Sequence, residues 1–381
     1  MVELIKHGVY LLDGQKVVED TTGMPSADEA RENTITYGIL RAHDVNGGKG
    51  KEMHIRFDAM MSHDITYVGI IQTARASGLT KFPLPYAMTN CHNSLCAVGG
   101  TINEDDHVFG LSAAKKYGGI YVPANQAVIH QFAREEMVKC GNMILGSDSH
   151  TRYGSLGNMG VGEGGGELVK QLLRNTWDIN APEVVLVWLE GTPRHGIGPH
   201  DVAISLVKAV FESGFVKNKV LEFAGPGVAN LSVDFRNGID VMTTETTCLS
   251  SIWVTDEKVR EHYELHRRPE DYKELRPGKV AYYDSMVRID LSKQESMIAL
   301  PYHPSNAVSI HELQADPEGV LRRVEEDTKR RFGDKVQPDL VSKIRDGKVY
   351  ADQGIIAGCS GGTYENLCEA AAILRGQSAG N

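Results

Sequence analysis

The chain has 381 residues, of which 41% are hydrophobic and 24% are charged, and its formal net charge is −10. This composition is ordinary for a water-soluble globular chain, and the length predicts two or three domains. The acidic balance disfavours nonspecific nucleic-acid binding, because a phosphate backbone needs a basic face. No apolar run approaches the ~20 residues of a membrane span, and Met1–Lys6 lacks the apolar core of a signal peptide, so we expect a cytoplasmic protein.

Six cysteines are scattered along the chain without a paired framework. In a long intracellular chain this pattern favours reduced thiols, or a metal or cluster ligand, over disulfides. Most buried cysteines are simply small apolar core residues, and this is our prediction for Cys96, Cys140, Cys248 and Cys368.

In chain order, residues 1–50 carry little signal. Asp64–Gly78 predicts a helix that ends at its glycine, and Gly118–Val122 predicts a short strand. His130 then follows two β-branched residues. We expect this histidine to line a site.

The most informative stretch begins with the apolar run Met143–Leu145, which predicts a buried strand followed by a turn. Asp148, Ser149 and His150 come next, where sites form in parallel α/β sheets, outside the carboxyl ends of strands. The glycine-rich Gly154–Gly166 would let backbone approach backbone or ligand closely. A polar turn with a helix cap is the alternative interpretation.

The second half begins with Val184–Glu190, a near-continuous apolar run typical of a strand buried on both faces. Pro193–Pro199 breaks the chain, and Pro199–Ser213 predicts a helix. We therefore expect domains over residues 1–195 and 196–310, with the start of a third over 311–381. His195 and His200 would be solvated loop residues.

Towards the C-terminus, the charge-rich Asp256–Lys279 predicts a solvated insertion. Asp316–Phe332 predicts a helix with an aspartate N-cap and proline at its first position. Gly354–Gly362 predicts a strand and glycine turn ahead of a helix over Tyr364–Arg375. A thiol just before a helix N-terminus, here Cys359, would have a lowered pKa that favours metal ligation.

Several of these motifs, taken together and in order, resemble the aconitase / isopropylmalate isomerase family from about residue 50 onward. The resemblance implies layered α/β/α domains related by internal duplication, here without the C-terminal swivel domain, and a hydratase/dehydratase (hydro-lyase) activity on a small hydroxy acid. The segments that carry it are Tyr117–Gly118, Val128–Gln131, Gly146–Thr151 with the glycine run behind it, Gly225–Val228 and Ile355–Asn366.

The resemblance also implies roles for individual residues. It pairs His130 with Asp148 and His150 with Glu245, and it adds His92 as a further active-site histidine. An imidazole whose pKa is set by a buried carboxylate supplies the proton transfer that moving water across a carbon–carbon bond needs.

The remaining matched positions bind substrate and cofactor in the family. Asp64, Thr66 and Ser149 would contact substrate. Cys359 would be one of three protein ligands of a [4Fe-4S] cluster.

Four positions depart from the family pattern, and each loses a polar group that the family uses: Val68, Cys91, Val241 and Gly361. The family's other two cluster ligands and its catalytic serine fall beyond these 381 residues. We therefore expect a fragment, a subunit completed by a small subunit, or a member that has lost the cluster, and no activity for this chain alone.

Other functions stay open. A cluster-free, non-enzymatic binding or regulatory protein would retain the fold. A mononuclear metal hydrolase would use His92, His130 and His150 as zinc ligands. A serine hydrolase is disfavoured because no Gly-x-Ser-x-Gly elbow surrounds Ser149. His92, Glu245 and His303 also admit purely structural or surface roles.

Overall fold

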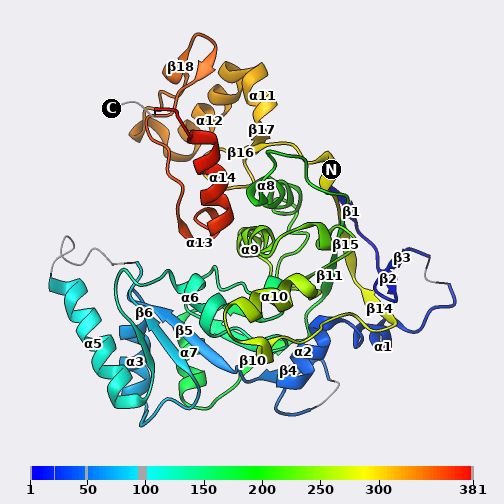
Figure 1. Ribbon diagram of the computed structural model, residues 1–381, viewed down its shortest axis with the longest axis vertical. Helices are drawn as coiled ribbons and strands as arrows, with labels where there is room; N and C mark the ends of the chain where they lie inside the picture. Colours follow the sequence, from blue (N-terminus) through cyan, green and yellow to red (C-terminus); the bar gives the residue numbers. More distant parts are fainter. Residues whose placement is uncertain (1, 21, 48–49, 93–100, 379–381) are drawn as a thin grey trace.

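The computed structural model describes residues 2–20, 22–47, 50–92 and 101–378. Within these residues the chain is a mixed α/β structure built on two five-stranded sheets, one in the first half of the chain and one in the second (Figure 1). This confirms the predicted fold class. Among the described residues, no helix is long and apolar enough to cross a membrane.

The first sheet is entirely parallel, in the order β7-β6-β5-β8-β9. Strands β5, β6 and β8 are buried at every position, as expected for a sheet covered on both faces. The predicted strands near residues 120 and 143 are confirmed. The strands are β5 (Ala59–His63), β6 (Tyr86–Thr89), β7 (Ile120–Val122), β8 (Met143–Gly146) and β9 (Met159–Gly162).

Helices accompany this sheet, and their apolar residues share one core with its strands. The helix predicted from Asp64 begins at Tyr67 and ends before Gly78, whose φ of 99° suits a glycine. The helices are α3 (Tyr67–Ala76), α5 (Thr101–Tyr117), α6 (Ile129–Glu136) and α7 (Gly165–Leu172).

The second sheet has the order β1-β15-β11-β12-β13, and β1 is its antiparallel edge. The buried strand predicted over Val184–Glu190 is confirmed as the central strand β11. β1 and β11 both precede residue 195 but belong to this sheet, so neither a boundary at residue 195 nor one just before β11 keeps the sheet whole. The division into three domains stays a prediction. The other strands are β1 (Val2–Ile5), β12 (Val220–Ala224), β13 (Ser250–Trp253) and β15 (Ser285–Asp290).

The remaining helices cover the second sheet or follow it (Figure 1). The predicted Asp316 N-cap is confirmed, because its side chain accepts from the Gly319 N–H. The helices are α1 (Ala27–Arg31), α2 (Ile35–His43), α8 (Pro199–Val210), α9 (Val233–Met242), α10 (Glu257–Leu265), α11 (Ile310–Ala315), α12 (Pro317–Phe332), α13 (Gly358–Gly361) and α14 (Tyr364–Leu374), with a short 3-10 turn, η3 (Thr243–Thr246).

Smaller sheets complete the fold. They pair β10 (Trp177–Asn180) with β4 (Glu52–Ile55), β14 (Val280–Tyr283) with β2 (Val9–Leu12) and β3 (Lys16–Val18), β16 (Met297–Ala299) with β17 (Ala307–Ser309), and β18 (Ile344–Arg345) with β19 (Lys348–Val349).

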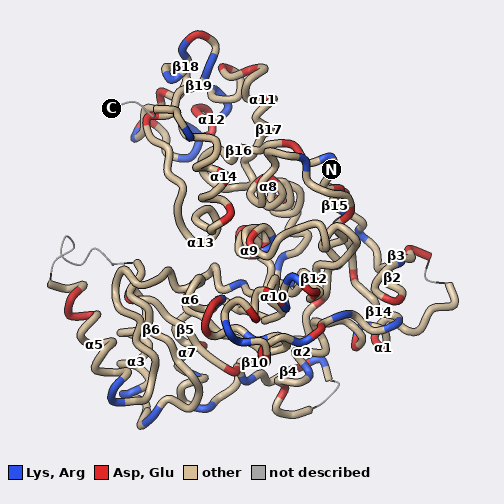
Figure 2. The backbone as a smooth tube through the Cα atoms, viewed as in Figure 1, with Lys and Arg blue, Asp and Glu red and all other residues tan. Residues whose placement is uncertain are grey.

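The charge-rich segment Asp256–Lys279 is not a solvated insertion, so that prediction is wrong. It forms α10, which carries acidic and basic stretches (Figure 2) but buries Val259 and Tyr263. The Tyr263 hydroxyl donates to the Leu156 carbonyl oxygen at 2.8 Å, and Arg268 donates to the carbonyl oxygens of Glu135 in α6 and Val138 just after it. The prediction considered only the charge content and missed Val259 and Tyr263, two apolar residues on the same face of the helix.

Further predictions for the second half are also wrong. The helix from Pro199 ends at Val210 and not at Ser213. Residues Ile355–Ala357 form no strand, because no described strand pairs with them, and Ile355 is 75% exposed. His200 is half-buried in the first turn of α8 and not in a loop.

The cysteine predictions are mostly confirmed. The described cysteines are free thiols, and Cys140 and Cys248 are buried. Cys368 is exposed on α14, so its prediction as a core residue is wrong. Cys96 lies outside the described residues.

Candidate functional site

Three neighbouring strands of the first sheet end at the candidate site. His63 closes β5, Cys91 and His92 follow β6, and Asp148 and His150 follow β8. Because β6, β5 and β8 are adjacent and parallel, their carboxyl ends lie at one edge of the sheet. Chain order and strand order differ here, so residues far apart in sequence meet.

The Asp148 carboxylate is the centre of the site. Its Oδ1 lies 3.1 Å from His130 Nε2 and accepts the His150 backbone N–H at 2.7 Å. Its Oδ2 lies 3.4 Å from His92 Nε2 and 3.6 Å from His63 Nε2. Burial alone would raise the pKa of the Asp148 carboxyl, but hydrogen bonds from the histidines hold that pKa well below its usual value. Asp148 is therefore a carboxylate at neutral pH.

His130 is a buried, neutral imidazole. It sits in the first turn of α6 with 2% of its surface exposed, and its Nδ1 lies 3.1 Å from the Tyr153 hydroxyl. Burial lowers the pKa of His130 despite the hydrogen bond to Asp148. Since the carboxylate must accept, we assign Nε2–H as the donor to Asp148 and Nδ1 as the acceptor from Tyr153.

His150 joins the two halves of the chain. Its Nε2 lies 3.3 Å from Glu245 Oε1, in the turn η3 that follows α9. Thr244 strengthens this junction, because its hydroxyl donates to the Ser149 carbonyl oxygen at 2.6 Å. Hydrogen bonds to Asp148 and then to Glu245 raise the pKa of His150 to about 9, so this imidazole is positively charged at neutral pH.

His92 is the second charged imidazole. Hydrogen bonds to Asp148 and then to Cys91 raise its pKa to about 10. Cys91 Sγ lies 3.3 Å from His92 Nδ1, and the buried Asp64 carboxylate accepts the His92 backbone N–H at 3.1 Å. Asp64 also lies 3.3 Å from His107 Nε2. In this structure Asp64 positions the loop that carries His92.

The predicted substrate contacts differ in their surroundings. Thr66 is half-buried, with its hydroxyl 2.6 Å from that of Ser147. Ser149 is exposed beside the charged His150. Val68 is partly buried and packs on the core. Their roles in binding substrate stay predictions.

Cys359 lies on the one-turn helix α13 and is half-buried. The predicted lowering of its pKa is wrong: burial raises the pKa of the thiol, which lies within α13 and not directly before the predicted helix, which begins at Tyr364. Arg134, 1% exposed on α6, donates to the Cys359 carbonyl oxygen at 3.0 Å. Its Nε and Nη2 are buried without a hydrogen-bond partner in the described part of the chain.

Sequence reasoning missed four residues near this site: His63, Arg134, Tyr153 and the role of His303. His63 gave a usable signal, because it ends a buried run immediately before Asp64. His303, expected to be a loop residue, stacks on Phe211 with ring centroids 3.7 Å apart. Its Nε2 lies 3.8 Å from Glu245 Oε2.

The structure does not bring His92, His130 and His150 together as the three ligands of a zinc ion. These histidines meet through Asp148, and the ring centroids of His130 and His150 are 6.3 Å apart. Among the described residues, the group with ligand atoms within 4.8 Å of one another is His63, Asp64 and His92.

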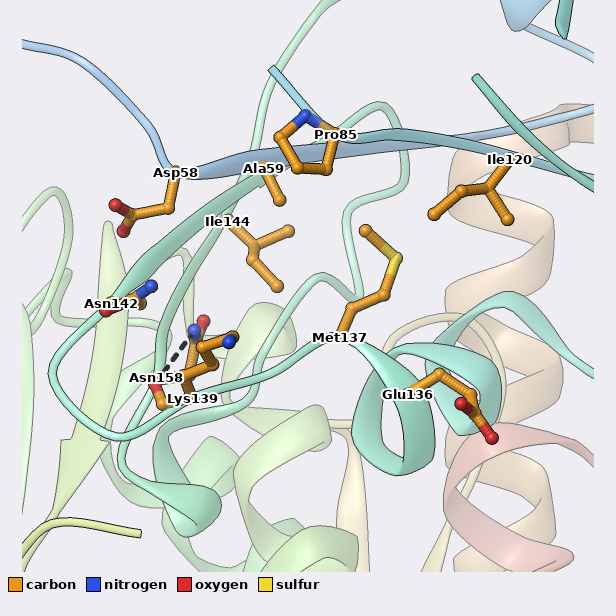
Figure 3. Close-up of a pocket in the computed structure, with 10 residues that line it drawn as sticks. All are labelled: Asp58, Ala59, Pro85, Ile120, Glu136, Met137, Lys139, Asn142, Ile144 and Asn158. Carbon is orange, nitrogen blue, oxygen red and sulfur yellow. Dashed lines mark hydrogen bonds between the residues drawn. The ribbon is translucent and has the colours of Figure 1, made fainter. Parts of the chain in front are cut away.

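A separate cavity of about 190 Å³ lies at the opposite edge of the first sheet (Figure 3). It is lined near the starts of β5, β6 and β7 by Ala59, Pro85 and Ile120, with Met137 pointing into it. Because the histidines gather at the carboxyl ends of these strands, this cavity is not part of the candidate site.

Fold and site together indicate a protein built to hold imidazoles and carboxylates at one sheet edge. The chain matches the model of the aconitase family (aconitate hydratase) over residues 37–381. It therefore belongs to the aconitase family.

Individual relatives are distant. The chain is 26% identical over 286 residues to 3-isopropylmalate dehydratase large subunit 1 of Thermotoga maritima, covering 74% of this chain and 68% of the relative. It is 27% identical over 369 residues to mitochondrial aconitate hydratase of Aspergillus fumigatus, covering 90% of this chain and 44% of the relative. It is 28% identical to the 3-isopropylmalate dehydratase large subunit of Moorella thermoacetica, covering 75% of that protein. The chain thus spans less than half of the aconitate hydratase it matches.

Proposed function

We propose that this chain forms the proton-transfer core of a hydro-lyase that adds or removes water across a carbon–carbon bond of a small hydroxy acid. The observation that carries the proposal is the Asp148 carboxylate, whose Oδ1 contacts the neutral His130 and the charged His150 and whose Oδ2 contacts the charged His92. The chain belongs to the aconitase family, which supports a hydration or dehydration reaction.

The two charged imidazoles suit the acid half of a dehydration. The side chains of His150 and His92 are 33% and 35% exposed, so both reach solvent at the site. His150 would supply the proton with which the departing hydroxyl leaves as water, and Glu245, 3.3 Å from its Nε2, would keep the imidazole charged until then. The positive charges would also attract the substrate carboxylates.

His130 cannot be the acid, because it is buried and neutral. Its role would be to fix Asp148, with Tyr153 fixing His130 in turn. The base that removes the carbon-bound proton would come from a C-terminal portion or a small subunit. The substrate, the partner and a cytoplasmic location all remain parts of this proposal.

The family's [4Fe-4S] cluster is part of the proposal for the complete protein. Cys359 fits the role of one ligand, and the orphaned Nε and Nη2 atoms of Arg134 fit an anionic group beside it, such as a thiolate-ligated cluster. Among the other described cysteines, Cys140 and Cys248 are buried in the core, Cys368 is exposed and Cys91 contacts His92, so the described residues do not offer a complete ligand set. When bound, the cluster would polarise the substrate hydroxyl as a Lewis acid.

The test uses the longest natural form of the protein, purified without oxygen. Iron and acid-labile sulfide are measured first, and small hydroxy acids are then screened for the ultraviolet absorbance of a newly formed unsaturated acid. We expect turnover with at least one acid and its loss in His150→Gln. Protein with a full complement of iron and sulfide that turns over no hydroxy acid would refute the proposal.

A second function is favoured by the position of Cys91. A thiol replaces the family's carboxylate beside His92, so the site would still hold an anion but transfer protons less effectively. A binding or regulatory protein would then bind hydroxy acids without turnover. Calorimetry and the absorbance assay on one protein sample distinguish the two functions.

A further inference from the structure

The cavity of about 190 Å³ at the amino-terminal edge of the first sheet has a buried floor and an exposed rim (Figure 3). Its floor includes Ala59, Ile144 and Asn158, which are 7%, 1% and 0% exposed. Its rim includes Ile120, which is 41% exposed, and the exposed Glu136. A small molecule can therefore enter the cavity from solvent and reach buried groups.

The middle of the cavity is apolar. Figure 3 shows the side chains of Ala59, Met137 and Ile144 gathered around one space. The carboxylates of Asp58 and Glu136 are turned away from that space in the same view. An occupant would thus pack mainly against methyl, methylene and thioether groups.

The charged groups around the cavity already have partners. Asp58 Oδ2 accepts the Met143 backbone N–H at 2.8 Å and lies 2.8 Å from His43 Nε2. The Lys139 ammonium lies 2.8 Å from Asp271 Oδ1. A charged ligand would have to compete with these contacts, so the lining favours a neutral ligand.

One polar group on the floor lacks a partner. The Asn158 Nδ2 amide donates to the Lys139 carbonyl oxygen at 3.2 Å, shown by the dashed line in Figure 3. This bond fixes the orientation of the amide, because a carbonyl oxygen accepts only from the nitrogen. Asn158 Oδ1 is then left buried without a hydrogen-bond partner among the described residues. A ligand hydroxyl that donates to Oδ1 would satisfy it.

The volume limits the size of the ligand. An apolar protein cavity of roughly 150 Å³ binds benzene. A cavity of about 190 Å³ therefore suits one six-membered ring with one small substituent. Met137 extends into the space (Figure 3), and its unbranched, flexible thioether can move aside to let the substituent reach Asn158.

We propose that this cavity binds one neutral molecule that consists of a six-membered ring with a single hydroxyl, of which phenol is the simplest example. The ring packs on Ala59, Met137 and Ile144. The hydroxyl donates to Asn158 Oδ1. This binding site is separate from the Asp148 site, because it lies at the opposite ends of strands β5 and β8, and it does not rest on the proposed hydro-lyase activity.

The experiment titrates phenol into the full-length protein by calorimetry and follows the methionine methyl resonances by NMR. We expect one phenol per chain and a ring-current shift of the Met137 methyl, which is assigned by its absence from Met137→Ala. Ile120→Trp places a larger ring at the exposed rim and should weaken phenol binding by about 10-fold or more. Val128→Trp is the matched control, because Val128 is also β-branched and 40% exposed but does not line the cavity, and it should leave affinity unchanged.

Two further measurements test the hydroxyl contact and the size limit. Asn158→Leu removes the acceptor at similar side-chain size and should weaken phenol binding by about 3- to 10-fold relative to benzene, the net contribution of one hydrogen bond. 2-Naphthol, with two fused rings, should bind to Met137→Ala and not to the wild type. If Asn158→Leu fails to fold by circular dichroism, the comparison of Ile120→Trp with Val128→Trp decides the matter.

The proposal is overturned if the wild type shows no saturable phenol binding, if Ile120→Trp binds phenol as tightly as the wild type, or if Val128→Trp loses binding as well. An unchanged ratio of phenol to benzene affinity in folded Asn158→Leu would refute the hydroxyl contact, and wild-type binding of 2-naphthol would refute the size limit. Because none of these measurements uses turnover, failure here leaves the hydro-lyase proposal standing, and the converse also holds.

Discussion

Replacing Glu245 by glutamine tests whether the Glu245 carboxylate keeps His150 positively charged. The change removes one negative charge 3.3 Å from His150 Nε2 and nearly preserves side-chain size. At that distance Coulomb's law gives about 5 kcal/mol for an effective dielectric constant of about 20, and about 1.3 kcal/mol for about 80. The two side chains are 33% and 27% exposed, so solvent screening places the interaction near the lower limit.

A change of about 1.4 kcal/mol corresponds to one pKa unit, so Glu245→Gln should lower the pKa of His150 from about 9 to about 8. The measurement is an NMR titration of the imidazole C–H resonances, with His150 assigned by its loss in His150→Gln. Glu270→Gln, at an exposed position on the surface, is the matched control.

The same substitution changes stability with a defined sign. His150 has a folded-state pKa above its unfolded value of 6.5, so its contribution is complete below about pH 6.5 and is lost as pH rises through about 9. In Glu245→Gln, the stability contribution of His150 should be lost about one pH unit lower than in the wild type. A His150 pKa that moves by less than about 0.3 unit, or that moves equally in Glu270→Gln, would refute the reasoning.

Three further changes give independent tests. Tyr153→Phe removes the hydroxyl that holds His130 Nδ1 and should lower the free energy of unfolding by about 1–3 kcal/mol in urea titrations; an unchanged midpoint would contradict this contact. Asp148→Asn breaks a buried charge network and should cost about 3–5 kcal/mol by the same assay, together with any hydro-lyase activity; a fully active variant would contradict the proposed centre. Gly162→Ala would place its Cβ 2.4 Å from the Asp148 carbonyl oxygen and should lower stability or displace the site, whereas Gly164→Ala meets nothing within 4 Å and should not. Equal melting temperatures for the two alanine variants would show that the close approach is unimportant.

Local patterns were enough to predict much of this protein. The apolar run at Val184–Glu190 predicts a strand because a segment buried on both faces needs such a composition. The Asp316 N-cap marks the start of α12 because its side chain satisfies a helix N–H. The resemblance placed His130 beside Asp148 and His150 beside Glu245, and the structure has both contacts.

Only the tertiary structure shows how the strands are ordered. The sequence places His63, His92 and Asp148 in three separate segments, and they meet because β5 lies between β6 and β8. Strand order depends on the whole buried core, so no local pattern encodes it. The same reason explains the errors at Cys359 and at α10. The pKa of a thiol and the burial of a charge-rich helix depend on what packs against them, and those contacts come from distant parts of the chain.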